Sequence, residues 1–91
     1  MAIVAVKLRI TGIVHGVFFR VSMANEATSR GVSGWVRNAA DGSVHALLEG
    51  EEERVERIIE WARRGPPRAR VDSIETERVR PRNSRGFRIE G

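Results

Sequence analysis

Hydrophobic and polar residues alternate near the start of the chain, as they do in a half-buried strand. The aliphatic positions lie two residues apart: Val4, Val6, Leu8 and Ile10. A period of two places these side chains on one face of a strand. We therefore expect a first strand that begins near Val4 and ends at Gly12.

Four later segments carry a strand pattern: residues 32–38, 43–49, 70–79 and 87–89. Asp41-Gly42 separates the first two of these segments and is typical of a tight hairpin connection. The alternation within the third segment is imperfect around residues 72–74, which indicates a bulge. The last segment is short enough to predict only a brief final strand.

Two segments carry the helical period instead. Within residues 51–64, apolar side chains recur at i, i+3, i+4 and i+7: Val55, Ile58, Ile59 and Ala62. Gly65 and the two prolines after it end this helix. A second helix is expected over about residues 19–30 and has a narrower apolar face, with Gly31 as its stop signal. The apolar members of that face are Val21, Met23, Ala24 and Ala27.

The predicted order of elements is therefore β-α-β-β-α-β, followed by the brief final strand, over a single domain, residues 1–91. This order is that of the α+β ferredoxin-like (split βαβ) sandwich, in which two helices cover one face of an antiparallel sheet.

The amino-acid composition limits the class of protein and its expected location. Hydrophobic residues make up 41% of the chain and charged residues 31%, values typical of a globular protein. No apolar run is long enough to cross a membrane, residues 1–7 lack the basic region and long apolar stretch of a secretory signal, and cysteine is absent. We expect a cytoplasmic protein without a membrane partner, and the scarcity of Asn and Gln is a feature of thermostable proteins.

Basic residues exceed acidic residues by four, and all of them except Lys7 are arginine. The guanidinium fork matches phosphate geometry, so this excess suits an anionic partner. Charge alone does not distinguish a small phosphorylated molecule from a nucleic acid, and most of these arginines are equally compatible with a solvated surface.

Two short motifs could carry chemistry. Residues 12–20, GIVHGVFFR, form a glycine-punctuated loop between a strand and a helix, where backbone N–H groups and the helix dipole favour an anion and Arg20 could add a bidentate grip. Asn38 ends the second strand beside a turn. Each motif alone has a plain structural explanation: many turns contain two glycines, and Asn often bonds its own turn.

Together, the two motifs resemble the paired signatures of the acylphosphatase family. The first is glycine-x-valine-x-glycine-valine-x-aromatic-arginine, and the second, at residues 34–38, is glycine-aromatic-valine-basic-asparagine followed by further glycines. Both match in order and spacing, and the resemblance covers the order of elements over nearly the whole chain. The family's fold is also the split βαβ sandwich.

The resemblance implies hydrolysis of small-molecule acyl phosphates to carboxylate and inorganic phosphate, with no metal and no cofactor. The family's catalytic arginine and asparagine correspond to Arg20 and Asn38. Its phosphate site would be formed by the backbone amides of His15, Gly16, Val17, Phe18, Phe19 and Arg20. Arg20 would neutralise the phosphoryl oxygens, Asn38 would orient the attacking water, and the substrate's own phosphate would take the proton.

The histidine of the loop and four aromatic side chains are expected to have structural roles or to modify the site. His15 stands where the family most often has glutamine, and a ring that titrates near phosphate could alter the pH dependence. Phe18 and Phe19 are expected to anchor the loop and core. Trp35 should pack on the face opposite Asn38, and Trp61 should lie at the margin of its helix's apolar stripe or in a dimer contact.

Three alternatives remain open. A nucleic-acid module can share this order of elements, but the central strands lack the aromatic residues on which bases stack. Domains of this type also begin larger carbamoyl-transfer maturation proteins. A non-catalytic anion-binding protein would keep the loop and lose the reaction.

Overall fold

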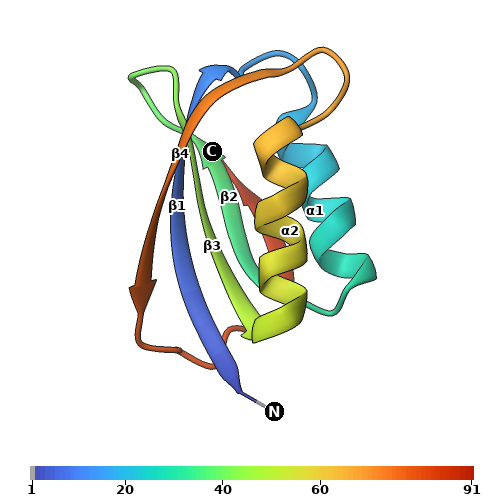
Figure 1. Cartoon of the computed structure of the whole chain (residues 1–91), viewed down its shortest axis with the longest axis vertical. Coiled ribbons are helices and arrows are strands. Elements are labelled where there is room, and N and C mark those ends of the chain that lie inside the picture. The colour runs from blue at the N-terminus through green and yellow to red at the C-terminus, as the bar shows by residue number, and fades with distance from the viewer. Residues whose placement is uncertain (1) are drawn as a thin grey trace.

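Five strands and two helices make up the computed structural model, which describes residues 2–91. In chain order they are β1 (Ile3–Ile13), α1 (Phe19–Ser29), β2 (Ser33–Asn38), β3 (Val44–Glu51), α2 (Glu52–Arg64), β4 (Arg70–Val79) and β5 (Phe87–Glu90). The strands form one sheet in the order β4-β1-β3-β2-β5. Both helices lie side by side on one face of this sheet (Figure 1).

The core lies between the sheet and the helices, and the alternation of the strands determines which residues enter it. The aliphatic set of β1 is buried as predicted, and so are Val44, Ala46 and Leu48 of β3. On α2 the buried residues are Val55, Ile58 and Ala62, while acidic residues occupy its first turn and arginines its last, as the helix dipole favours.

The predicted α+β sandwich is therefore present, with one difference in the sheet. The β1–β3, β1–β4 and β2–β3 pairs are antiparallel, but β5 runs parallel to β2. The sheet is accordingly mixed rather than antiparallel throughout. The long connection after β4 carries the chain past the three other strands to the far edge of the sheet, where β5 pairs with β2 in the parallel direction.

The buried stripe of α1 also differs from the prediction. Phe19, Met23 and Ala27 are buried, four residues apart, whereas Val21 is exposed. The predicted apolar face omitted Phe19, the first residue of α1, and included Val21, although Phe19 is the residue in line with Met23 and Ala27.

A bulge lies where the alternation of β4 was imperfect. The register between β1 and β4 shifts between Thr11 and Gly12, so that Asp72 has no partner opposite it. Gly12 has a φ of 131°, and a Cβ there would collide with the carbonyl oxygen of Arg70. Position 12 of β1 therefore requires glycine at this bulge.

Glu49 on β3 fastens the connection between β4 and β5. The residue is 5% exposed, and its carboxylate accepts hydrogen bonds from the backbone N–H groups of Arg82, Asn83 and Ser84, and from Ser84 Oγ. Burial by itself raises the pKa of Glu49, but these hydrogen bonds outweigh it and hold the pKa below its usual range. Nothing in the sequence pattern singled out this residue.

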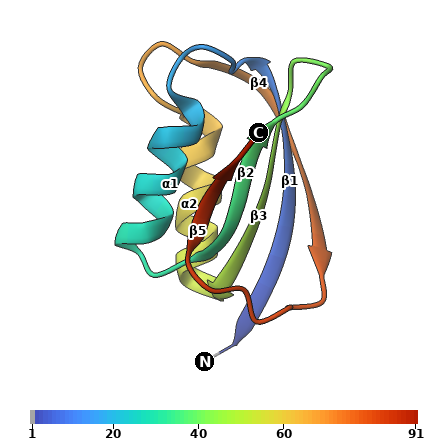
Figure 2. The same ribbon diagram turned by 180° about the vertical axis from the view of Figure 1, so that it is seen from behind.

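The β1–α1 loop, the β2–β3 turn and the C-terminus lie at the same end of the sheet (Figure 2), opposite the N-terminus. Segments that carry both sequence motifs are thus brought together. Within residues 2–91, no helix is long and apolar enough to cross a membrane.

We expect Glu49→Gln to lower the free energy of unfolding by about 1–3 kcal/mol at pH 7, because an amide cannot accept all of these hydrogen bonds. Since the folded-state pKa lies below the unfolded value of about 4.3, this stabilisation is complete above that value and is lost as the pH falls through the folded pKa. Urea unfolding of both proteins from pH 7 to pH 3 measures it.

The difference between wild type and Glu49→Gln should be constant near neutrality and shrink in acid. Glu77→Gln, at an exposed position of β4, is the matched control and should have little effect. A difference that persists undiminished at pH 3 would contradict the role of the ionised carboxylate.

Candidate active site

The β1–α1 loop, residues 14–18, is anchored in the core by two of its side chains. Val14 and Val17 are buried, and Phe19 directly after them is 1% exposed and packs against Trp61, with ring centroids 5.4 Å apart. Trp61 thus lies beside the apolar stripe of α2, as predicted, with Phe19 as its partner. These contacts fix the loop against both helices.

The backbone of this loop turns twice into the left-handed region. Gly16 has a φ of 71°, and Phe18, the residue before α1, has a φ of 65° and a ψ of 25°. Loops with such turns form concave nests of N–H groups. Within residues 2–91, the backbone N–H groups of residues 15–20 donate to no backbone or side-chain acceptor.

The start of α1 adds to this surplus of donors. No side chain caps the helix, and its first turn contains no acidic residue. The first N–H groups of a helix have no intrahelical acceptor and carry the positive end of the dipole. The loop and the helix start together offer free donors of the kind that bind an anion.

Arg20, in the first turn of α1, is half-buried, and its Nη1 donates to the backbone oxygen of Gly91 at 3.1 Å. Among the residues described, no aspartate or glutamate forms an ion pair with Arg20. The Arg20 guanidinium thus has no aspartate or glutamate partner among these residues, and it borders the cavity described below. Arg20 and Gly91 are 71 positions apart in the sequence, so no local pattern could predict this contact.

Asn38, at the end of β2, faces the same side of the sheet as the helices. In the part of the chain that the structure describes, its Oδ1 is buried and has no hydrogen-bond partner. A buried carbonyl oxygen without a donor loses about 1–3 kcal/mol of hydration. Such an atom points to a donor that arrives from outside the chain.

Arg20 and Asn38 border one cavity of about 330 Å³. The other lining residues are Val14, Gly16, Phe18, Phe19 and Val21. The structure therefore brings together both catalytic candidates and part of the predicted loop. His15 and Val17 do not line the cavity, and any part they take in binding would be through their backbone.

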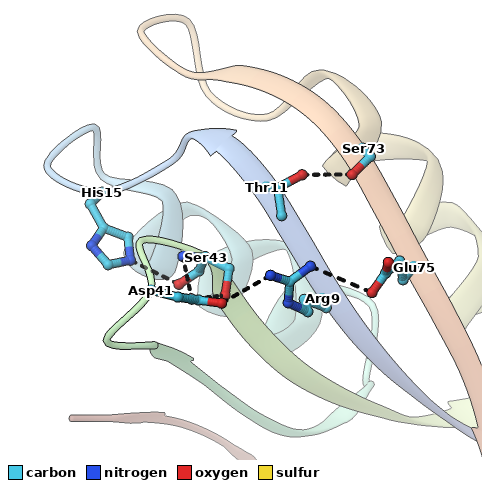
Figure 3. Close-up of polar contacts among 7 residues, drawn as sticks. All are labelled: Arg9, Thr11, His15, Asp41, Ser43, Ser73 and Glu75. Atoms are coloured by element: carbon cyan, nitrogen blue, oxygen red, sulfur yellow. Dashed lines mark hydrogen bonds and ion pairs between the residues drawn. The ribbon is translucent and has the colours of Figure 1, made fainter.

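His15 instead ties the loop to the β2–β3 turn. Its Nε2 lies 2.8 Å from the carbonyl oxygen of Ser43 and points toward the turn (Figure 3). Because that acceptor is a carbonyl, Nε2 carries the proton. The side chain thus links the free N–H groups to the hairpin that carries Asn38.

The turn itself is held by Asp41. Its carboxylate accepts hydrogen bonds from Ser43 Oγ and the Ser43 N–H, and from Arg9 at 2.9 Å (Figure 3). The Ser43 bonds, followed by the Arg9 bond, hold the pKa of Asp41 well below its usual range. The carboxylate therefore stays charged and the turn stays fixed near neutral pH.

Two aromatic residues lie outside the loop's core contacts. Trp35 is on the helix-free face of the sheet, opposite Asn38 as predicted, with the Arg37 guanidinium 5.6 Å from its ring centroid. Phe18 was expected to anchor the loop, but it is 70% exposed. Its left-handed backbone turns the side chain away from the core.

The described residues contain no group of three or more His, Asp or Glu side chains placed to hold a metal ion. The cavity lining also lacks a carboxylate and a histidine. The polar groups that line the cavity are one guanidinium, one amide and the backbone.

Comparison with known proteins decides the family. The acylphosphatase family model matches residues 6–89. An acylphosphatase of Thermococcus kodakarensis is 51% identical over 88 residues, which cover 97% of both chains. The chain belongs to the acylphosphatase family.

Solved acylphosphatases also share its fold. The acylphosphatase of Bacillus subtilis superimposes with a TM-score of 0.93 at 31% identity and covers 97% of this chain and 99% of its own. The HypF protein of T. kodakarensis, a larger protein, superimposes with a TM-score of 0.85 at 32% identity, and only 12% of its chain is covered. The family comprises hydrolases acting on acid anhydrides, and the predicted ferredoxin-like class is confirmed.

The position of His15 in this acylphosphatase-family protein leads to a prediction. His15→Leu removes the hydrogen bond to Ser43, so the loop should be held less firmly and the Kd for inorganic phosphate should rise about 2- to 10-fold, the range of one hydrogen bond. Isothermal titration calorimetry measures this Kd.

His15→Gln is the matched variant, because its amide can still donate to the Ser43 carbonyl. We expect it to stay within about twofold of wild type. Equal phosphate affinity in wild type and His15→Leu would show that the tether does not order the loop.

Proposed function

We propose that the protein hydrolyses acyl phosphates by attack of water on a phosphoryl group held by the β1–α1 loop and Arg20. The observation that carries this proposal is the unpartnered Oδ1 of Asn38, buried beside the cavity that Arg20 also lines. An anion-binding site needs positive charge and N–H donors. The buried oxygen of Asn38 can only accept a hydrogen bond, and we assign water as the neutral donor.

Each group has one role in the proposed reaction. The N–H groups of residues 15–20 and the guanidinium of Arg20 bind the phosphoryl oxygens, and Asn38 Oδ1 accepts a hydrogen bond from the water. The water oxygen forms a bond to phosphorus while the bond from phosphorus to the acyl oxygen breaks. A carboxylate leaves, and the second proton of the water passes to a phosphoryl oxygen, giving dihydrogen phosphate.

No protein base and no metal enters this sequence of steps. The leaving carboxylate is a good leaving group, so fixed geometry and charge neutralisation supply most of the acceleration. The lining has no Asp, Glu or His that could take the proton, which favours the phosphoryl oxygen as the acceptor. Turnover should therefore persist in excess chelator.

The alternative function is anion binding without turnover. The free N–H groups and Arg20 would suit it equally. The position of Asn38 favours hydrolysis, because a pure anion receptor gains nothing from an oxygen acceptor beside the anion.

Arg20→Lys should lower kcat/KM for an acyl phosphate by about 10²-fold or more, because a point charge does not reproduce the two-pronged contact. Phosphate release in the presence of chelator measures the loss. Arg57→Lys, an exposed arginine on α2, is the matched control and should retain wild-type turnover. Comparable activity in Arg20→Lys and wild type would argue against a bidentate role.

Asn38→Ala should lower kcat on the order of 10²-fold while inorganic phosphate still binds, since the amide is proposed to hold water and not phosphate. Single-turnover rates and phosphate titration separate the two effects. Asn25→Ala, on the exposed side of α1, controls for loss of an asparagine. If phosphate affinity collapsed in Asn38→Ala, its role would be as a phosphate ligand or turn residue.

A further inference from the structure

Phe18 is placed at the expense of stability in two respects. It is 70% exposed, and its φ of 65° lies in the left-handed region that large side chains seldom adopt. Glycine would occupy this position without strain. An exposed aromatic side chain in a strained backbone conformation gains nothing from the folded chain itself, which points to a contact made with a ligand.

Val21, one helical turn after Phe18, is a second exposed apolar side chain. It is 51% exposed, although it belongs to the otherwise well-packed first turns of α1. Both side chains line the cavity that Arg20 and Asn38 border. The two buried apolar residues of the lining, Val14 and Phe19, belong to its floor. The exposed pair therefore extends the apolar lining from the floor to the mouth.

The cavity lining carries charge at one place only. Arg20 is the one charged residue in the lining, and the proposed function commits it to the phosphoryl group. No second cation of the lining is left for a carboxylate or a phosphate at the other end of the substrate. The volume of about 330 Å³ is also near the lower limit of ligand sites, about 300–1,000 Å³.

We propose that Phe18 and Val21 form the acyl-binding part of the site and that the preferred substrates are acyl phosphates with a compact apolar acyl group. This inference rests on the proposed function and specifies its substrate class. A flat or branched hydrocarbon group would cover Phe18 and Val21 while the phosphoryl group lies in the loop. Acyl groups that carry a second charge would have to leave it unpaired beside an apolar wall.

The test compares benzoyl phosphate with acetyl phosphate in wild type, Phe18→Gly and Val21→Thr. The two substrates differ in intrinsic reactivity, so the readout is the change in their kcat/KM ratio on mutation, in which that difference cancels. Each variant should shift the ratio about 3- to 10-fold toward acetyl phosphate, the range of one aromatic or aliphatic contact. Glycine suits the backbone at position 18, and threonine keeps the shape of valine.

Ile3→Ala is the matched control, because Ile3 is 53% exposed at the opposite end of β1. It should leave both activities and their ratio at wild-type values. Binding is measured separately with benzylphosphonate and methylphosphonate, which cannot be hydrolysed. Wild type should bind benzylphosphonate about 3- to 10-fold more tightly, and both variants should reduce this preference.

The outcomes separate the two proposals. Ratios that stay at the wild-type value in both variants, with no preference for benzylphosphonate, would overturn the apolar acyl site and leave the hydrolysis intact. Preferential binding of benzylphosphonate that depends on Phe18, without turnover of either acyl phosphate, would support the apolar site and overturn the hydrolysis. Tighter binding of methylphosphonate would overturn the apolar site.

Discussion

The site depends on one constraint: a loop must be rigid although its own N–H groups are unbonded. Burial of Val14, Val17 and Phe19 on either side of the exposed residues supplies that rigidity without using the backbone donors. Hydrophobic packing therefore replaces the hydrogen bonds that would otherwise order the segment. The donors of residues 15–20 stay free, and this freedom makes an anion-binding loop possible.

The remaining parts of the structure bring other groups to this loop. The sheet order places the end of β2, with Asn38, beside the start of α1, and the parallel entry of β5 carries Gly91 to Arg20. Glu49 holds the connection that leads into β5, although it lies on the central strand and not in the cavity. Stability and function are joined here by chain connectivity, because the last strand both completes the sheet and steadies the arginine.

The sequence predicted most where a local rule operates. Strand and helix periods, the stop signals at Gly31 and Gly65 and the β4 bulge follow from neighbouring residues, and the two motifs identified Arg20 and Asn38 as candidates. The sequence did not predict contacts between residues far apart in the chain. It also did not predict the orientation of a side chain that depends on the backbone conformation of a single residue. Glu49 and Gly91 act on residues more than thirty positions away. The exposure of Phe18 depends on a left-handed φ that no pattern of apolar residues reveals.

The central claim is that water attacks phosphorus and not the acyl carbon. Hydrolysis of benzoyl phosphate in ¹⁸O-labelled water, with chelator present, tests it directly, and ³¹P NMR of the phosphate and mass spectrometry of the benzoate locate the label. The account predicts label in the phosphate alone, after correction for spontaneous hydrolysis. Label in the benzoate would mean that the acyl carbon is attacked, and the roles proposed for Arg20 and Asn38 would then be wrong.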